Sequence, residues 1–165
     1  MRATVPKAII IKISLGPALF VALMLAINAF TAGASAGESE GWRAYQARDY
    51  SRAEQLWQRD AAKGDRHAAF GLGMLADRQG DEAAAAVHYE KAASAGLGSA
   101  QVLIADRYIS GKGVAANPIV AFAWLTRAVA SGVPNAATIR DQLAQTMTAD
   151  AVREAEALAQ TLNSK

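Results

Sequence analysis

The stretch Ala100–Ala136, AQVLIADRYISGKGVAANPIVAFAWLTRAVASGVPNA, carries the pattern that decides the fold. Its first part has apolar residues at helical spacing, including Ile104 and Ala105, and the glycines of GKGV interrupt that spacing. Asn117 and Pro118 then mark a second helix start, because asparagine caps free backbone N–H groups and proline at the first helical position loses no hydrogen bond. The stretch is therefore predicted to form two helices joined by a glycine turn.

The same features recur along the chain at intervals of 32 to 36 residues. Each unit has a glycine, an alanine four residues after it, another alanine eleven residues before it, and a large ring seven or eight residues before it. The glycines are Gly64, Gly96 and Gly132, and the rings are Trp57, Tyr89 and Trp124. No segment alternates as a half-buried strand would, so each unit is predicted to be an antiparallel helix pair. A single pair cannot bury its apolar face alone, which favours an all-α solenoid of stacked pairs.

The helical spacing and the capping residues predict roughly four helix pairs. The first pair is expected to be incomplete, because only Gly41–Ala47 precedes the turn at Arg48 and Asp49. Gly64 is the expected left-handed stop of one helix, and Asp65 the expected cap of the next. The remaining helices are predicted at Tyr50–Lys63, Arg66–Gln79, Glu82–Ala95, Ser99–Ser110, Pro118–Ser131, Pro134–Gln145 and Thr148–Leu162.

The quoted stretch resembles the Sel1-like repeat, a subtype of the tetratricopeptide superfamily. The residues that carry the resemblance are Tyr108, Gly111-Lys112-Gly113-Val114, Asn117, Ala121, Trp124, Ala128 and Gly132. The preceding unit, 68–100, keeps Leu72-Gly73 and the run Tyr89–Gly96 but lacks the GKGV insertion, which accounts for its shorter period. The resemblance implies an α-solenoid with Sel1-like repeats over 37–136 and capping helices over 137–165. The chain departs from the disulfide-rich members of the group because it has no cysteine.

The first 36 residues have the three parts of a secretory signal. Arg2, Lys7 and Lys12 precede a long apolar run, which closes on the small residues Ala34-Ser35-Ala36. The sequence predicts a signal at 1–36 that is cleaved before Gly37, and hence a periplasmic or secreted mature protein. The alternative is an uncleaved membrane anchor, because the run is long enough to cross a bilayer.

The charge of the mature chain gives no reason to expect a nucleic-acid partner. The whole chain has 17 Lys and Arg against 15 Asp and Glu, and the predicted signal contains three of the cations and none of the anions. The mature chain therefore has a net charge of −1, and its cations are scattered from Arg43 to Lys165 without the basic stripe that phosphate binding needs.

The residue patterns also predict no catalytic, cofactor-binding or metal site. His67 and His88 are the only histidines, and they lie on different predicted helices without an acidic partner at ligand spacing. Asp81-Glu82 is typical of a helix N-terminus. Gly71-Leu72-Gly73 lies inside a predicted helix and Gly111-Lys112-Gly113 in the repeat turn, so neither is expected to bind phosphate. No SxxK or GxSxG motif occurs.

One helix face remains as a candidate binding groove. By resemblance to tetratricopeptide arrays, it would accept an extended segment or a helix of another protein; the alternative is that its apolar members are core between adjacent pairs. Its residues are His67, Phe70, Met74, Asp77, Ser99, Val102, Asp106 and Ile109. The function expected from the sequence is a non-enzymatic periplasmic adaptor or regulatory protein that binds a protein or peptide partner. The alternative function is binding or processing of peptidoglycan or β-lactams.

Overall fold

The structure, a computed structural model, describes residues 36–162, with side chains described from Glu40 onward. All regular secondary structure in this range is α-helical, which confirms the predicted fold class. The helices are α2 (Ala36–Gln46), α3 (Tyr50–Ala61), α4 (Arg66–Gln79), α5 (Glu82–Ser94), α6 (Gly98–Ser110), α7 (Pro118–Ala130), α8 (Ala136–Ala144) and α9 (Ala149–Thr161). The predicted signal segment lies outside the described residues except for Ala36, which begins α2. The division into 37–136 and 137–165 stays a prediction.

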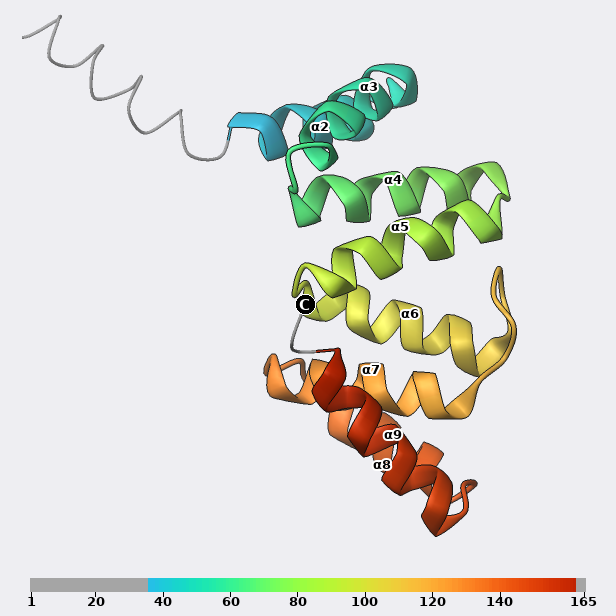
Figure 1. Cartoon of the computed structure of the whole chain (residues 1–165). Coiled ribbons are helices and arrows are strands. Elements are labelled where there is room, and N and C mark those ends of the chain that lie inside the picture. Colours follow the sequence, from blue (N-terminus) through green and yellow to red (C-terminus); the bar gives the residue numbers. More distant parts are fainter. Residues whose placement is uncertain (1–35, 163–165) are drawn as a thin grey trace, which may run out of the picture. The chain divides into compact units, whose positions relative to one another are not determined.

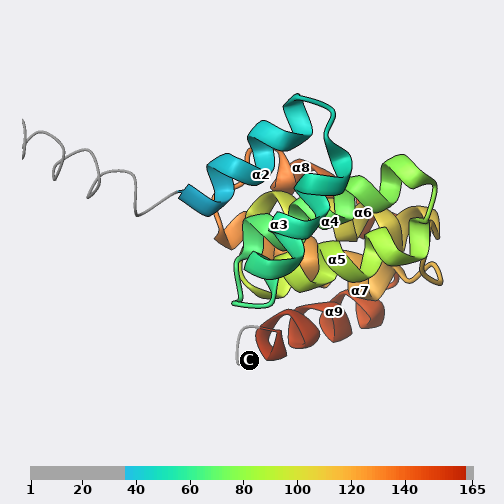
Figure 2. The same ribbon diagram turned by 90° about the horizontal axis from the view of Figure 1, so that it is seen from above.

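The helices form a stack of two layers. Along the stack, α4 packs against α3 and α5, and α6 packs against α5 and α7 (Figure 1). Viewed down the stack, the even-numbered helices lie along one side and the odd-numbered helices along the other (Figure 2). At the C-terminal end, α8 and α9 both pack against α7. The stacked antiparallel pairs confirm the predicted solenoid.

Capping residues start most of the helices where the sequence predicts. The side chain of Asp65 accepts hydrogen bonds from the backbone N–H groups of His67 and Ala68, and the side chain of Asn117 accepts bonds from two N–H groups at the start of α7. Thr148 caps α9 in the same way. The helix predicted to begin at Pro134 begins instead at Ala136, because Asn135 adopts a left-handed conformation that interrupts the helical path.

The rings of Trp57 and Tyr89 each pack where a facing helix has a glycine. Trp57 of α3 is fully buried between two glycines: a Cβ on Gly41 would lie 2.3 Å from its Nε1, and a Cβ on Gly71 would lie 2.5 Å from its ring. Tyr89 packs against Gly73 in the same way, with 2.6 Å to an added Cβ. The glycines of the Gly71-Leu72-Gly73 run therefore serve close helix packing inside α4, as their helical placement predicts.

The GKGV turn joins two consecutive helix pairs through backbone contact. Gly111 ends α6 in a left-handed conformation, and Gly113, also left-handed, lies against the first turn of α5. A Cβ on Gly113 would lie 2.0 Å from the carbonyl oxygen of Glu82, while Val114 packs against the core. The turn needs glycine at both positions, for conformation at the first and for conformation and space at the second.

Within residues 36–162, no helix combines the length and apolar character that a membrane crossing requires.

Candidate protein-binding surface

The structure places all eight predicted groove residues on the two central helices of the even-numbered layer. Four lie on α4 and four on α6, and their exposure differs between the two helices. Ala68, Leu72 and Ala76, which lie on α4 between these residues, are buried. The arrangement therefore brings the predicted residues onto neighbouring helices of one layer.

The α4 members are largely engaged with the rest of the protein. Phe70 packs against Tyr89 with ring centroids 5.5 Å apart, and both Phe70 and Met74 are partly buried against the core. His67 is half-buried. Asp77 accepts hydrogen bonds from two other helices, as described below. On α4, the structure thus gives the apolar residues a packing role between helices.

The α6 members are more open to solvent. Ser99 and Asp106 are exposed, and Val102 is half-buried. Ile109 is 42% exposed, and with Val87 on α5 it is one of the two exposed large hydrophobic residues in the described part of the chain. If this face meets a partner, Ile109 is the apolar residue on it that is most available for contact.

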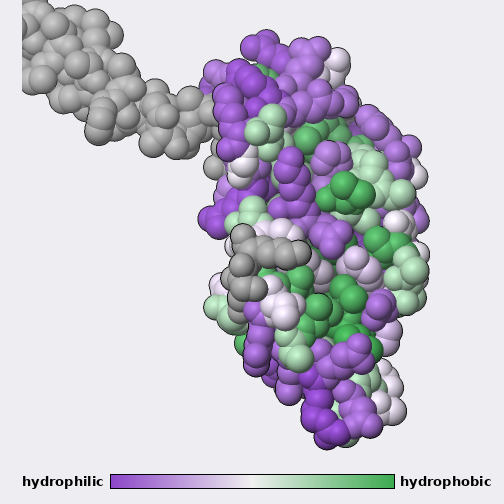
Figure 3. Space-filling model, in the orientation of Figure 1, coloured by the Kyte–Doolittle hydropathy of each residue, from purple (hydrophilic) through white to green (hydrophobic). Residues whose placement is uncertain are grey.

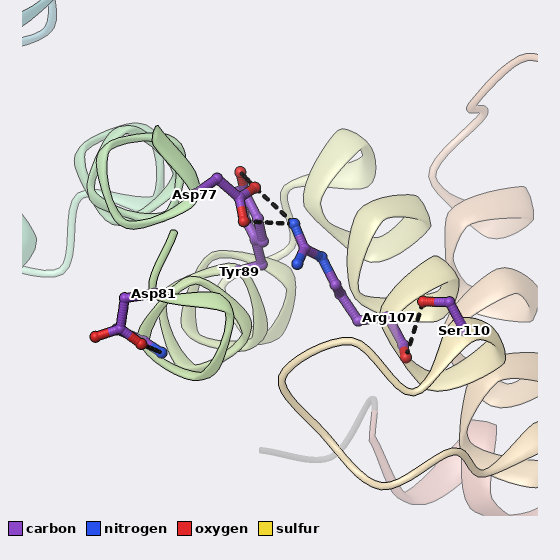
Figure 4. Close-up of polar contacts among 6 residues, drawn as sticks. Asp77, Asp81, Tyr89, Arg107 and Ser110 are labelled. Atoms are coloured by element: carbon purple, nitrogen blue, oxygen red, sulfur yellow. Dashed lines mark hydrogen bonds and ion pairs between the residues drawn. The ribbon is translucent and has the colours of Figure 1, made fainter. Parts of the chain in front are cut away.

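A polar network joins three helices at the edge of this surface (Figure 4). The carboxylate of Asp77 on α4 accepts a hydrogen bond from the hydroxyl of Tyr89 on α5 at 2.8 Å, and Nη2 of Arg107 on α6 lies 2.6 Å from each of its oxygens. Side-chain exposure is 11% for Arg107 and 31% for Asp77. The network therefore links two helix pairs while keeping one carboxylate partly open to solvent.

The Tyr89 hydroxyl makes the stability of the fold sensitive to alkaline pH. Burial raises the pKa of Tyr89 far above its ordinary value of 10.0, and the hydrogen bond to Asp77 raises it further. Above pH 10 the unfolded chain loses the tyrosine proton while the folded chain keeps it, so stability falls as pH rises.

Replacing Tyr89 by phenylalanine tests this coupling. At pH 7 the change is expected to cost about 1.5 kcal/mol, the lower end for a hydrogen bond to a charged group, because Asp77 is partly solvated. Above pH 10 the difference between the variant and the original protein should shrink, since only the original protein has this phenol to titrate. Urea unfolding at pH 7 and pH 10.5 measures both values, and a difference that stays constant or grows at the higher pH would contradict the coupling.

Some residues next to this surface were not predicted from the sequence. They are two aromatic residues at the equivalent repeat positions on α2 and a buried glutamine on α6. Moving 32 residues back from Met74 and Asp77 gives Trp42 and Tyr45 on α2, whose rings lie 5.8 Å apart in an edge-to-face contact. The repeat period could have found both. Gln101 is 1% exposed; its amide donates to the carbonyl of Ala93 at 3.2 Å and accepts from the Ser131 hydroxyl at 3.0 Å. A single buried glutamine gives no such signal in sequence.

Two small hollows and one apolar region mark the rest of the surface. A hollow of about 330 Å³ lies between α2 and the start of α3, and one of about 260 Å³ lies between α7 and α9. On the face where α9 lies, apolar side chains gather over the middle of the stack, while hydrophilic residues predominate at its two ends (Figure 3). Polar ends are typical of capped solenoids. No cluster of metal-ligating side chains occurs among the described residues.

Comparison with solved structures identifies the fold of the chain. The chain is similar to a protective antigen present in uropathogenic Escherichia coli strains, whose crystal structure displays a Sel1-like repeat fold, with a TM-score of 0.70 and 31% sequence identity. The match covers 83% of this chain and 31% of the antigen, so the chain spans about a third of the antigen's length. No protein-family model and no curated protein matches. The chain therefore has the Sel1-like repeat fold.

Proposed function

We propose that this protein is a non-enzymatic interaction module that binds a segment of another protein on the even-numbered helix layer. The observation that carries the proposal is the exposed apolar side chain of Ile109, which lies on the same helix as exposed Asp106 and half-buried Val102. Stacked helices hold these residues on a preformed surface, so they do not have to become ordered when a partner binds. Preorganisation of this kind lowers the entropic cost of association.

The partner is expected to contact the surface chiefly through apolar anchors. The surface offers one net carboxylate at Asp106, because Asp77 is neutralised by Arg107. A few buried apolar contacts usually dominate the affinity of such interfaces. The proposed partner segment therefore has a bulky apolar side chain that packs on Ile109 and Val102.

Substitution of Ile109 by aspartate tests the surface. Ile109→Asp is expected to weaken partner capture by about tenfold or more, as loss of a central apolar anchor does. Because the side chain is 42% exposed, the helical circular dichroism should be retained. Phe70→Asp and Met74→Asp are poorer tests, since both side chains pack against the core.

Val87→Asp is the matched control for this experiment. Val87 is 65% exposed and lies on α5, in the opposite layer. Equal capture by Val87→Asp and the original protein, with loss in Ile109→Asp, supports the proposal. Loss in Val87→Asp alone places the interface on the odd-numbered layer and overturns it, as does turnover of a β-lactam or a muropeptide by the purified protein.

We also propose that the protein acts outside the cytoplasm after removal of residues 1–36. The support is the sequence pattern: cationic residues, then an apolar run, then a cleavage site with small residues at Ala34-Ser35-Ala36. N-terminal sequencing of the protein from a periplasmic fraction is expected to begin at Gly37. A protein that keeps Met1 or Arg2 and stays with the membrane fraction would instead support the uncleaved anchor.

A further inference from the structure

The contact between the second helix pair (α4 and α5) and the third (α6 and α7), here called the joint, differs in chemistry from the contacts between the other consecutive pairs. Asp77 and Arg107 meet across this joint, and they occupy the same repeat positions as Tyr45 and Leu75 one unit earlier, each 32 residues back. Tyr45 is aromatic and packs on the core, and Leu75 is apolar and belongs to the core. One unit later, 36 residues on from Arg107, the equivalent residue is Leu143, which also packs on the core.

The substitution of an ion pair for apolar residues has an energetic consequence. Leu75 is 3% exposed, and the side chain of its equivalent, Arg107, is 11% exposed. A cation that is nearly buried needs a partner, and removal of that partner leaves a charge without compensation. The Asp77–Arg107 pair joins two different helices, whereas the pairs Arg59–Asp60, Lys63–Asp60, Arg140–Asp141 and Arg153–Asp150 each join residues one or three positions apart.

We propose that Asp77 and Arg107 form an electrostatic latch that sets the separation of the C-terminal ends of α4 and α6, and with it the spacing of the two helices that carry the candidate protein-binding surface. The latch acts at the C-terminal ends of these two helices, where the Tyr89 hydroxyl also holds the Asp77 carboxylate. Near the N-terminal end of α6, the Gln101 side chain bonds to the last turn of α5, so release of the latch is expected to separate the C-terminal ends of α4 and α6 while the N-terminal end of α6 stays held. The latch operates whether or not the groove has a partner.

Distance measurements between spin labels test the latch in the full chain. The protein has no cysteine, so labels attach only where cysteines are introduced. One pair, at Gln79 and Ser110, reports on the C-terminal ends of α4 and α6; a control pair, at Ser51 and Gln79, reports on the joint between α3 and α4. All three positions are exposed.

The expected result is a change confined to the first label pair. Asp77→Asn should broaden and lengthen the distance distribution between positions 79 and 110, and should leave that between 51 and 79 unchanged. Arg107→Met should do the same, the double variant should add little to either, and Arg107→Lys should restore part of the narrow distribution. Amide exchange in the last turn of α6 should become about tenfold faster or more in Asp77→Asn, as expected when a charged hydrogen bond is lost.

Two results would overturn the latch. Unchanged distances between 79 and 110 in both single variants would show that apolar packing alone sets the joint. Equal broadening of both label pairs would show general loosening of the array. Circular dichroism of each variant distinguishes loosening from unfolding.

Discussion

Replacement of Trp124 by alanine is expected to lower the free energy of unfolding by about 3 to 5 kcal/mol. Trp124 is 1% exposed in α7 and lies in the same core cluster as Ala121 and Leu125. The buried residues of this cluster are mostly alanines, whose side chains are too short to extend into the space that the indole leaves. The cost therefore includes both the lost apolar burial and a persistent cavity.

Urea unfolding followed by circular dichroism measures this effect. Val87→Ala is a suitable control, because Val87 is 65% exposed and its truncation should change stability by less than about 0.5 kcal/mol. A loss of under about 1 kcal/mol for Trp124→Ala would mean that the ring is not part of the core, and the burial of Trp124 in this cluster would be wrong.

Replacement of Gly113 by alanine is expected to cost about 2 to 5 kcal/mol, from two sources. Gly113 has a φ of +73°, where a side chain costs about 1 to 2 kcal/mol. The new Cβ would also lie 2.0 Å from the carbonyl oxygen and 2.4 Å from the carbonyl carbon of Glu82. These are backbone atoms that cannot rotate away, so the turn must separate from α5, at a further cost of about 1 to 3 kcal/mol.

Gly111→Ala separates the two sources. Gly111 has nearly the same φ, +74°, but the nearest atom to an added Cβ is the Cβ of Ala116 at 3.5 Å, an ordinary contact. Its substitution should therefore cost only the conformational part, about 1 to 2 kcal/mol. If the two variants lose equal stability in the same unfolding assay, the close contact between the GKGV turn and α5 does not hold.

The fold could be predicted from the sequence because its determinants are local and repeated. The cap at Asn117, the glycine turn after α6 and the recurring ring each have a short-range physical reason, and the period places them in equivalent units. Helix boundaries were harder to predict where the repeat pattern stops. The start of α8 depends on the left-handed conformation of Asn135, and the true start of α2 at Ala36 lies before the Gly41 boundary that the repeat suggested.

The candidate surface was predicted less completely, because helical periodicity assigns a residue to a face and does not show what covers that face. Phe70 and Met74 share a face with Ile109 by spacing, yet the neighbouring helices bury the first two in part and leave the third open. The partner of Asp77 is 30 residues away, and only the stacking of the second helix pair on the third brings Arg107 to it.

The proposed partner binds the even-numbered layer by contacting α6. Photo-crosslinking in cells measures this most directly, with a photoreactive amino acid placed at position 109 in one variant and at position 87 in another. We expect a discrete adduct from position 109, lost when Val102 is also changed to aspartate, and none from position 87. An adduct from position 87 with none from position 109 would contradict it.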